Sequence, residues 1–347
     1  MDTFRVDPKA IANEPAPAGH GVPAAPAALL SLYRSMVRLR TYDERSVVYH
    51  RQGRIGTYAI FWGHEALQAG AVHALGDEDW IFPSYRESAI GLIRGMPASK
   101  LLSWWRGHPE GWWDPREWRI ASIAVPVGSH VPHAAGMAWG LKLRGERSCV
   151  LAFFGDGATS TGAFHEGMTF AAAKRVPAVF LCNNNSWAAS TPVSEQSGTD
   201  RLVDKAAGYG MEGVRIDGAD AFAVRDTVRE AAARARAGEG PQLIEAVTFR
   251  GGPHATADDP GRYMDPAQLR AARERECLGR FESHLRQLGV IDQPSIARIR
   301  DEAMAEMESA IETAEDRPEP DPRQIFDTTY ALPPRALRRE RGSALEP

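Results

Sequence analysis

The sequence predicts an α/β fold with a mostly parallel sheet, and two observations carry this prediction. Residues 148–154 and 177–182 are continuous apolar runs, as expected for parallel strands that are covered on both faces. Between them, a glycine-rich turn leads into a helical segment, residues 164–175. A strand, a helix and a strand in this order form a crossover unit, and such units belong to parallel sheets.

The segments before this unit are predicted from apolar spacing. Apolar residues recur at helical intervals over residues 28–51, and a second helix is expected over residues 64–75. Residues 80–88 predict a short strand that turns into a loop. Residues 104–118 hold five of the nine tryptophans. Because glycine and proline interrupt this stretch, we expect an aromatic loop without a regular element.

The segments after the crossover unit continue the same pattern. We predict a helix over residues 221–237, a strand over residues 242–249 and a polar loop over residues 250–264. Two amphipathic stripes then indicate C-terminal helices.

Three regions follow from these elements. Residues 1–27 are rich in proline and alanine with few large apolar side chains, which predicts a flexible arm. Residues 28–316 form the predicted binding domain, and residues 317–347 a polar C-terminal tail.

Composition excludes several classes of protein. The net charge of -4 over 347 residues argues against a nucleic-acid-binding protein, which usually carries a basic field. No apolar stretch approaches the roughly 18 residues of a membrane span, and no secretory signal is visible. Three cysteines without close spacing support neither a disulfide framework nor a zinc site. We therefore expect a cytoplasmic protein.

Polar residues follow both apolar strands at the same edge of the predicted sheet. Asp156 stands between two glycines after the first strand, and Asn185 closes a run of three asparagines after the second. Ligands bind at this edge of open α/β sheets. Carboxylate and amide oxygens suit Mg²⁺, and the N–H groups around Gly157 suit a phosphate. The pair predicts a site for a hard cation, suited to Mg²⁺, and a diphosphate.

These motifs resemble a known family. The glycine–aspartate–glycine turn and the asparagines, with twenty-six residues between Gly157 and Asn184, resemble the thiamine diphosphate signature. More narrowly, the chain resembles the alpha subunit of the decarboxylating component of 2-oxo acid dehydrogenase complexes. The resemblance covers residues 29–316 and rests on the segments GHEALQ (63–68), FPSYRE (82–87), VGSHVPHAAG (127–136), FFGDGATSTG (153–162), CNNNSWAASTP (182–192) and GPHATADDP (252–260). It implies the thiamine-diphosphate-binding fold, three layers α/β/α with a mostly parallel sheet and C-terminal helices.

The resemblance assigns roles to individual residues. It implies that Mg²⁺ is held by the side chains of Asp156 and Asn185 and by the backbone carbonyl of Trp187. It implies that Tyr85 and Arg86 reach the diphosphate of the cofactor. The remaining cofactor contacts that it implies are the backbone groups of Gly157 and Ala158 on the diphosphate, and those of Val127 and Gly128 on the aminopyrimidine.

One histidine is the expected catalytic residue. His254 matches the loop histidine that the family places over the diphosphate and the reacting carbon. The neighbouring Arg250, Asp258 and Asp259 are expected to orient it or to tune its pKa toward neutrality. Asn183 departs from the family, because some members carry an arginine there that helps to neutralise the diphosphate.

The resemblance also implies partners and a reaction. It implies oxidative decarboxylation of a 2-oxo acid, pyruvate or a branched-chain acid, and transfer of the acyl group to a lipoyl carrier on an acyltransferase component. A beta subunit is expected to complete the site in an α₂β₂ heterotetramer. An acetoin dehydrogenase alpha subunit and a non-catalytic scaffolding subunit remain as alternatives. A dinucleotide-binding oxidoreductase is disfavoured, because the second strand ends in Cys182 and asparagines rather than in an acidic residue.

Overall fold

The computed structural model describes residues 25–274 and 276–345, and its centre is one five-stranded sheet. The strand order is β1-β2-β3-β7-β6, and every neighbouring pair is parallel. The strands are β1 (Trp80–Phe82), β2 (Val150–Gly155), β3 (Ala178–Asn184), β6 (Glu212–Asp217) and β7 (Gln242–Val247). The predicted α/β class with a mostly parallel sheet is confirmed.

Both faces of the sheet are buried, which explains why β2 and β3 are apolar up to their carboxyl ends. In β2, Leu151 and Phe153 belong to one buried cluster, whereas Val150, Ala152 and Phe154 belong to the cluster on the other face. Side chains alternate between the faces of a strand, so a run without polar residues fits only a strand covered twice.

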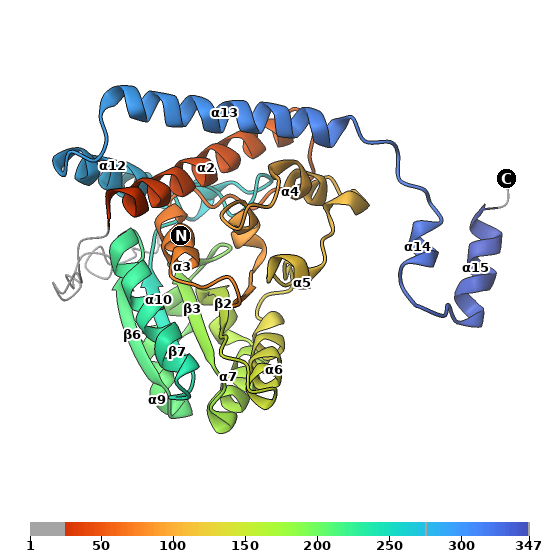
Figure 1. Ribbon diagram of the computed structural model, residues 1–347, viewed down its shortest axis with the longest axis horizontal. Coiled ribbons are helices and arrows are strands. Elements are labelled where there is room, and N and C mark those ends of the chain that lie inside the picture. The colour runs from red at the N-terminus through yellow and green to blue at the C-terminus, as the bar shows by residue number, and fades with distance from the viewer. Residues whose placement is uncertain (1–24, 275, 346–347) are drawn as a thin grey trace.

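Helices form the outer layers, as Figure 1 shows. The larger cluster includes residues of α2 (Pro26–Arg51), α3 (Glu65–His73), α10 (Ala221–Arg236), α12 (Cys277–Gln287) and α13 (Gln293–Glu315). The opposite cluster includes residues of α6 (His130–Leu143) and α7 (Gly162–Lys174). The arrangement is therefore three layers, α/β/α.

The remaining elements are short. The helices are α4 (Ala98–Trp105), α5 (Pro115–Trp118), α8 (Val193–Gln196), α9 (Lys205–Tyr209), α11 (Pro266–Glu274), α14 (Gln324–Asp327) and α15 (Arg335–Leu345). Single 3₁₀ turns cover Tyr85–Glu87, Ile90–Leu92, Pro109–Gly111, Asp156–Ser160, Leu202–Asp204 and Pro260–Arg262. A separate two-stranded ribbon pairs β4 (Trp187–Ala188) with β5 (Thr191–Pro192). No helix among the described residues is long and apolar enough to cross a membrane.

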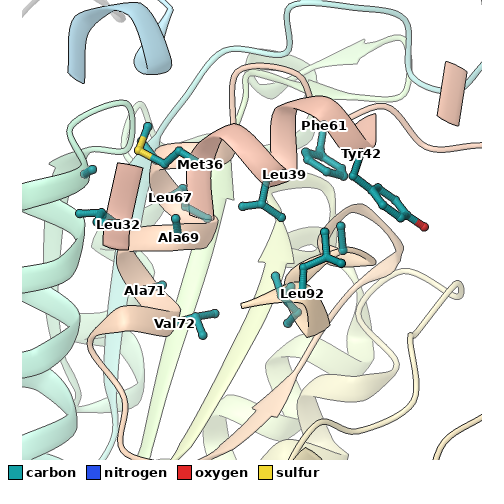
Figure 2. Close-up of a cluster of buried hydrophobic side chains, with 14 of the residues drawn as sticks. Leu32, Met36, Leu39, Tyr42, Phe61, Leu67, Ala69, Ala71, Val72 and Leu92 are labelled. Atoms are coloured by element: carbon teal, nitrogen blue, oxygen red, sulfur yellow. The ribbon is translucent and has the colours of Figure 1, made fainter. Parts of the chain in front are cut away.

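Helix α2 is the buried N-terminal helix that apolar spacing predicted. It begins with Pro26 in its first turn, where the missing N–H of proline costs nothing. Figure 2 shows Leu32, Met36 and Leu39 of α2 in one buried cluster with Leu67 of α3. All four side chains are almost completely buried, so α2 closes one face of the core.

The aromatic segment 104–118 was predicted without a regular element, and this prediction was wrong. Trp104 and Trp105 end helix α4, which is broken only afterwards at Gly107. Helix α5 then begins with Pro115, and the Asp114 carboxylate accepts a hydrogen bond from the N–H of Arg116. Glycine and proline here mark helix ends, not the absence of helices.

Strand β6 and helix α6 are two of the elements that the sequence analysis did not foresee. Strand β6 has exposed residues in its first half and contains Gly213, so it lacks an apolar run. Helix α6 carries glycine, proline and two histidines, and its apolar side chains do not form a regular stripe. Both elements were missed because a pattern of burial on one side is weak when a residue is small or lies at a sheet edge.

The terminal regions are only partly described. Residues 1–24 of the predicted arm lie outside the described residues, and α2 begins two residues before the predicted boundary at residue 28. Helices α14 and α15 lie apart from the rest of the ribbon in Figure 1. The division of the chain at residues 28 and 316 stays a prediction.

Replacement of the β2 core residue Phe153 by alanine tests the two-sided burial of the sheet. Phe153 is completely buried between helices and neighbouring strands. We expect Phe153→Ala to lower the free energy of unfolding by about 3–5 kcal/mol, because a large cavity remains. Leu143→Ala, at a side chain 68% exposed, is the control and changes it by about 0.5 kcal/mol or less. Equal effects in urea unfolding would contradict the layer assignment.

Candidate active site

One cavity of about 350 Å³ lies where strands β2 and β3 end. Gly155 pairs with Asn183 across these strands, so the polar residues that follow each strand lie beside one another. The cavity wall includes all the residues to which the sequence assigned a site role. These are Tyr85, Arg86, Val127, Gly128, Asp156, Gly157, Ala158, Asn185, Trp187 and His254.

Asp156 is a buried carboxylate at the head of the 3₁₀ turn that follows β2. Only 2% of it is exposed, and its Oδ2 accepts a hydrogen bond of 3.0 Å from Nε2 of Gln196. Burial raises the pKa of Asp156, and the Gln196 hydrogen bond opposes that rise. Asp156 has no ion-pair partner within the described part of the chain. Such a group is suited to an external cation.

Asn184, the last residue of β3, has a structural contact, whereas Asn185, which follows the strand, lies at the cavity. Nδ2 of Asn184 donates to the buried carboxylate of Glu245 at 2.7 Å. Asn185 lines the cavity, and its Oδ1 accepts from the N–H of Trp187 at 3.1 Å. Ser186 between them has a φ of 72°, which turns the chain sharply after Asn185. Asn185 therefore lines the same cavity as Asp156.

Asn183 also lines the cavity, and two side-chain hydrogen bonds hold it in place. Its Nδ2 donates to Nδ1 of His64 at 3.0 Å, and its Oδ1 accepts from the Thr248 hydroxyl at 2.5 Å. Arg can only donate hydrogen bonds, so an arginine at this position could not accept from the Thr248 hydroxyl as Asn183 does.

Two glycines let backbone approach the cavity closely. A Cβ atom at Gly157 would lie 2.7 Å from the Cβ of Ala188, so no side chain fits there. Gly128 has a φ of 78°, and a Cβ there would lie 2.4 Å from the Thr161 hydroxyl oxygen. Glycine is therefore needed at both positions for the close packing of the cavity wall.

Two buried arginines, Arg86 and Arg250, bring positive charge to Nδ1 of the cavity residue His254. Arg86 donates from Nη1 to the carbonyl of Ile60 and from Nη2 to His254. Arg250 is completely buried and donates to the carbonyl of Ala189 at 2.9 Å and to the hydroxyl of Tyr263 at 2.8 Å. Neither guanidinium forms an ion pair with a carboxylate among the residues described. Two buried guanidinium groups without an ion-paired carboxylate favour the binding of an anionic ligand.

Known proteins share this sequence pattern. The family described as dehydrogenase E1 component matches residues 33–323. The chain belongs to the dehydrogenase E1 component family. The 3-methyl-2-oxobutanoate dehydrogenase subunit alpha of Mycobacterium tuberculosis is 40% identical over 300 residues, 86% of this chain and 82% of that protein. The pyruvate dehydrogenase E1 component subunit alpha of Staphylococcus aureus is 37% identical over 310 residues, 89% of this chain and 84% of that protein.

These comparisons confirm the resemblance stated from the sequence. The chain is of the alpha-subunit type of 2-oxo acid dehydrogenase E1 components, and its fold is the one expected for that family. Dependence on thiamine diphosphate is general in the family. The roles of single residues in this E1 chain remain predictions.

The geometry assigns the protons of His254. Nη2 of Arg86 lies 3.0 Å from Nδ1 of His254, and Nη1 of Arg250 lies 3.4 Å from the same atom. Because arginine only donates, Nδ1 must accept, and the neutral ring carries its proton on Nε2. His254 therefore offers the E1 chain a hydrogen-bond donor at Nε2.

The pKa of His254 is lowered to about 4 by burial first and then by the charges of Arg86 and Arg250. The expectation that its neighbours tune this pKa toward neutrality was therefore wrong. Asp258 does oppose the shift, but its Oδ2 accepts from the backbone N–H of His254 at 2.7 Å. Asp259 accepts from the N–H of Gly261 and does not contact the ring.

Two contributors to the site were not assigned a cofactor role from sequence. Arg250 was noted only as a neighbour of His254, although it is the largest side chain among those almost fully buried. Gln196 was not singled out, because nothing in its local sequence indicates that it reaches Asp156 forty residues away. An arginine four residues before the histidine was the one available signal for Arg250.

The residues present fit both parts of a metal-bound diphosphate. Asp156 and Asn185 supply hard oxygen donors, and Arg86 with Arg250 supplies positive charge. No group of three or more histidine, cysteine, aspartate or glutamate side chains suited to a metal occurs in the described ranges. Mg²⁺ takes few protein ligands and completes its shell with phosphate and water.

The lowered pKa of His254 predicts a pH dependence of stability. A histidine titrates near 6.5 when unfolded and about 4 here, so between these values the unfolded chain binds more protons. The contribution of neutral His254 is complete above pH 6.5 and is lost as the pH falls toward 4. We expect His254→Gln to be less sensitive than the wild type to acid over this range, measured by urea unfolding at successive pH values.

Arg86→Gln tests whether the charge of Arg86 helps to lower the pKa of His254. Removal of the guanidinium leaves Arg250 as the remaining cation at Nδ1, so the pKa of His254 should rise toward 6.5. Imidazole ¹⁵N chemical shifts measured against pH report this value directly. An unchanged midpoint would show that Arg86 does not lower the pKa.

Proposed function

We propose that this E1 alpha chain binds thiamine diphosphate and Mg²⁺ in the cavity at the ends of β2 and β3, and that it acts with a beta subunit. The assembly decarboxylates a 2-oxo acid and passes the acyl group to a lipoyl carrier. One observation carries the site assignment: Asp156 and Asn185 line the same cavity as a guanidinium without a carboxylate partner, that of Arg86.

In this proposal Asp156 and Asn185 hold the metal through their side-chain oxygens, and the carbonyl of Trp187 adds a third ligand. Burial supports the assignment, because Asp156, Asn185 and Trp187 are all less than a tenth exposed. A cation among them offsets the cost of the buried Asp156 carboxylate. Mg²⁺ is the expected ion because all three ligands are oxygen atoms.

The diphosphate lies against the positive side of the cavity in the proposal. Tyr85 and Arg86 bind it with side-chain groups, and Gly157 and Ala158 with backbone groups. The guanidinium of arginine can bond two phosphate oxygens at once. Val127 and Gly128, on the loop before α6, bind the aminopyrimidine with main-chain groups.

His254 is the proposed catalytic residue of this chain. Its Nε2 carries the proton, and its low pKa keeps the ring neutral near pH 7. A neutral N–H stabilises developing negative charge on an oxygen and does not compete with Mg²⁺ by adding charge. Thiamine diphosphate, when bound, supplies an electron sink for the electrons that the departing CO₂ leaves behind.

A partner chain is proposed because this chain supplies one cofactor-binding sheet. The described residues form a single five-stranded sheet and one small ribbon, with no second sheet of comparable size. We propose an α₂β₂ heterotetramer in which the beta subunit covers the pyrimidine side, and a cytoplasmic location. All three cysteines are free and buried, which agrees with a reducing compartment.

A branched-chain 2-oxo acid is the first candidate substrate, and pyruvate is the second. Support for this order comes from the relative that acts on 3-methyl-2-oxobutanoate, which is 40% identical, against 37% for the pyruvate dehydrogenase subunit. Substrates that differ by one or two methylene groups differ by only about 1–3 kcal/mol in binding. Direct comparison is therefore required.

Coexpression with the beta subunit tests the function. The purified complex is assayed for decarboxylation of 3-methyl-2-oxobutanoate, pyruvate and acetoin with an artificial electron acceptor. We expect turnover that depends on thiamine diphosphate and Mg²⁺, with a higher kcat/KM for the branched-chain acid. Full turnover by the alpha chain alone would contradict the shared site.

Asp156→Asn tests the proposed metal ligand in the same complex. The amide keeps the size of the side chain but removes the charge that binds the cation. Loss of a direct ligand should exceed the roughly 10–100-fold effect of an outer contact, so we expect at least about 100-fold weaker Mg²⁺-dependent cofactor binding. Isothermal titration with thiamine diphosphate measures it, and wild-type affinity in the variant would reject the metal assignment.

A further inference from the structure

A short segment after Asn185 folds back over the turn that carries Asp156. We call residues 187–196 the strap. Its strands β4 and β5 pair Trp187 with Pro192, and α8 then ends at Gln196. The strap lies so close to the turn that a Cβ atom on Gly157 would lie 2.7 Å from the Cβ of Ala188.

The end of the strap is tied to Asp156 by one side chain. Nε2 of Gln196 donates to Oδ2 of Asp156 at 3.0 Å and to the carbonyl of Thr191 at 3.0 Å. Both N–H groups of the amide are used, and a flipped amide would direct its oxygen at two acceptors. The orientation of Gln196 is therefore determined by its surroundings.

We propose that Gln196 is a positioning residue that holds the Asp156 carboxylate in the orientation that binds the cation. This proposal rests on the proposed function, because it concerns the same metal site. The hydrogen bond restricts rotation of a carboxylate that has no ion-pair partner within the described ranges. Outer hydrogen bonds of this kind orient metal ligands and typically contribute 10–100-fold to metal affinity.

The strap does not depend on this hydrogen bond for its own fold. Pairing of β4 with β5 remains without it, as does the hydrogen bond of 3.2 Å from the N–H of Val193 to the carbonyl of Ser186. The Ser160 hydroxyl also donates to the main-chain carbonyl of Gln196 at 3.1 Å. Loss of the Gln196 amide should thus free Asp156 while the strap stays in place.

The test measures metal affinity in the alpha–beta complex with Gln196→Met, which keeps the length of the side chain and removes its donor. Mn²⁺ is titrated in the presence of thiamine diphosphate and followed by electron paramagnetic resonance. We expect Mn²⁺ to bind about 10–100-fold more weakly. The Mg²⁺ concentration for half-maximal activity should rise by the same factor, whereas kcat at saturating Mg²⁺ stays within about twofold.

Two further variants separate a positioning role from a structural one. Ser160→Ala removes the hydrogen bond from the Ser160 hydroxyl to the main-chain carbonyl of Gln196. It leaves the contact of Gln196 with Asp156, so its Mn²⁺ affinity should equal that of the wild type. Gln196→Asn keeps an amide but withdraws it by one methylene group, and should weaken Mn²⁺ binding as methionine does. If Gln196→Met does not fold, Gln196→Asn decides the question.

Asp156→Asn distinguishes the two proposals. Unchanged Mn²⁺ binding in Asp156→Asn would overturn the proposed metal site itself. Lost binding in Asp156→Asn together with wild-type affinity in the folded Gln196 variant would overturn only the role of Gln196. A fall in kcat with unchanged Mn²⁺ affinity would likewise show that Gln196 supports the fold and does not position Asp156.

Discussion

The parallel pairing of β2 with β3 is the constraint on which the site depends. Gly155 lies opposite Asn183, so the residues after both strands emerge at one edge of the sheet. Parallel strands can be neighbours only if a crossover returns the chain, and α7 is that crossover. A shift of one residue in this register would move every strand side chain to the opposite face, which both buried clusters oppose.

The buried charged side chains of Asp156, Arg86 and Arg250 at this edge form no ion pairs among the described residues. Burial makes the Asp156 carboxylate costly, and it makes the guanidinium groups of Arg86 and Arg250 costly as well. The acid is held apart from the arginines by different partners, Gln196 on one side and His254 with main-chain carbonyls on the other. A bound cation and a bound anion would each offset one part of this cost. Burial, together with the charges of the same arginines, lowers the pKa of His254 and keeps its ring neutral.

Membership of the E1 family describes the whole chain, whereas the geometry of the cavity describes how its local motifs meet. The relatives establish the type of chain over most of its length. The cavity explains how the local motifs of that family act together, because β1, β2, β3 and the loop after β7 each bring residues to one wall. Some features, such as Asn183 between His64 and Thr248, are explained only by contacts in this chain.

The sequence by itself determined the fold class and indicated which polar residues follow the strand ends at the cavity. Apolar runs predicted β2 and β3, and their polar successors predicted Asp156 and Asn185, because these signals are local. Tertiary structure alone decided the direction of the His254 pKa, the contact of Gln196 with Asp156 and the burial of Arg250. It also decided that β6 is a strand and that Trp104 lies in a helix. Electrostatic shifts and long-range hydrogen bonds depend on which distant groups meet in space, and no local pattern records those distances.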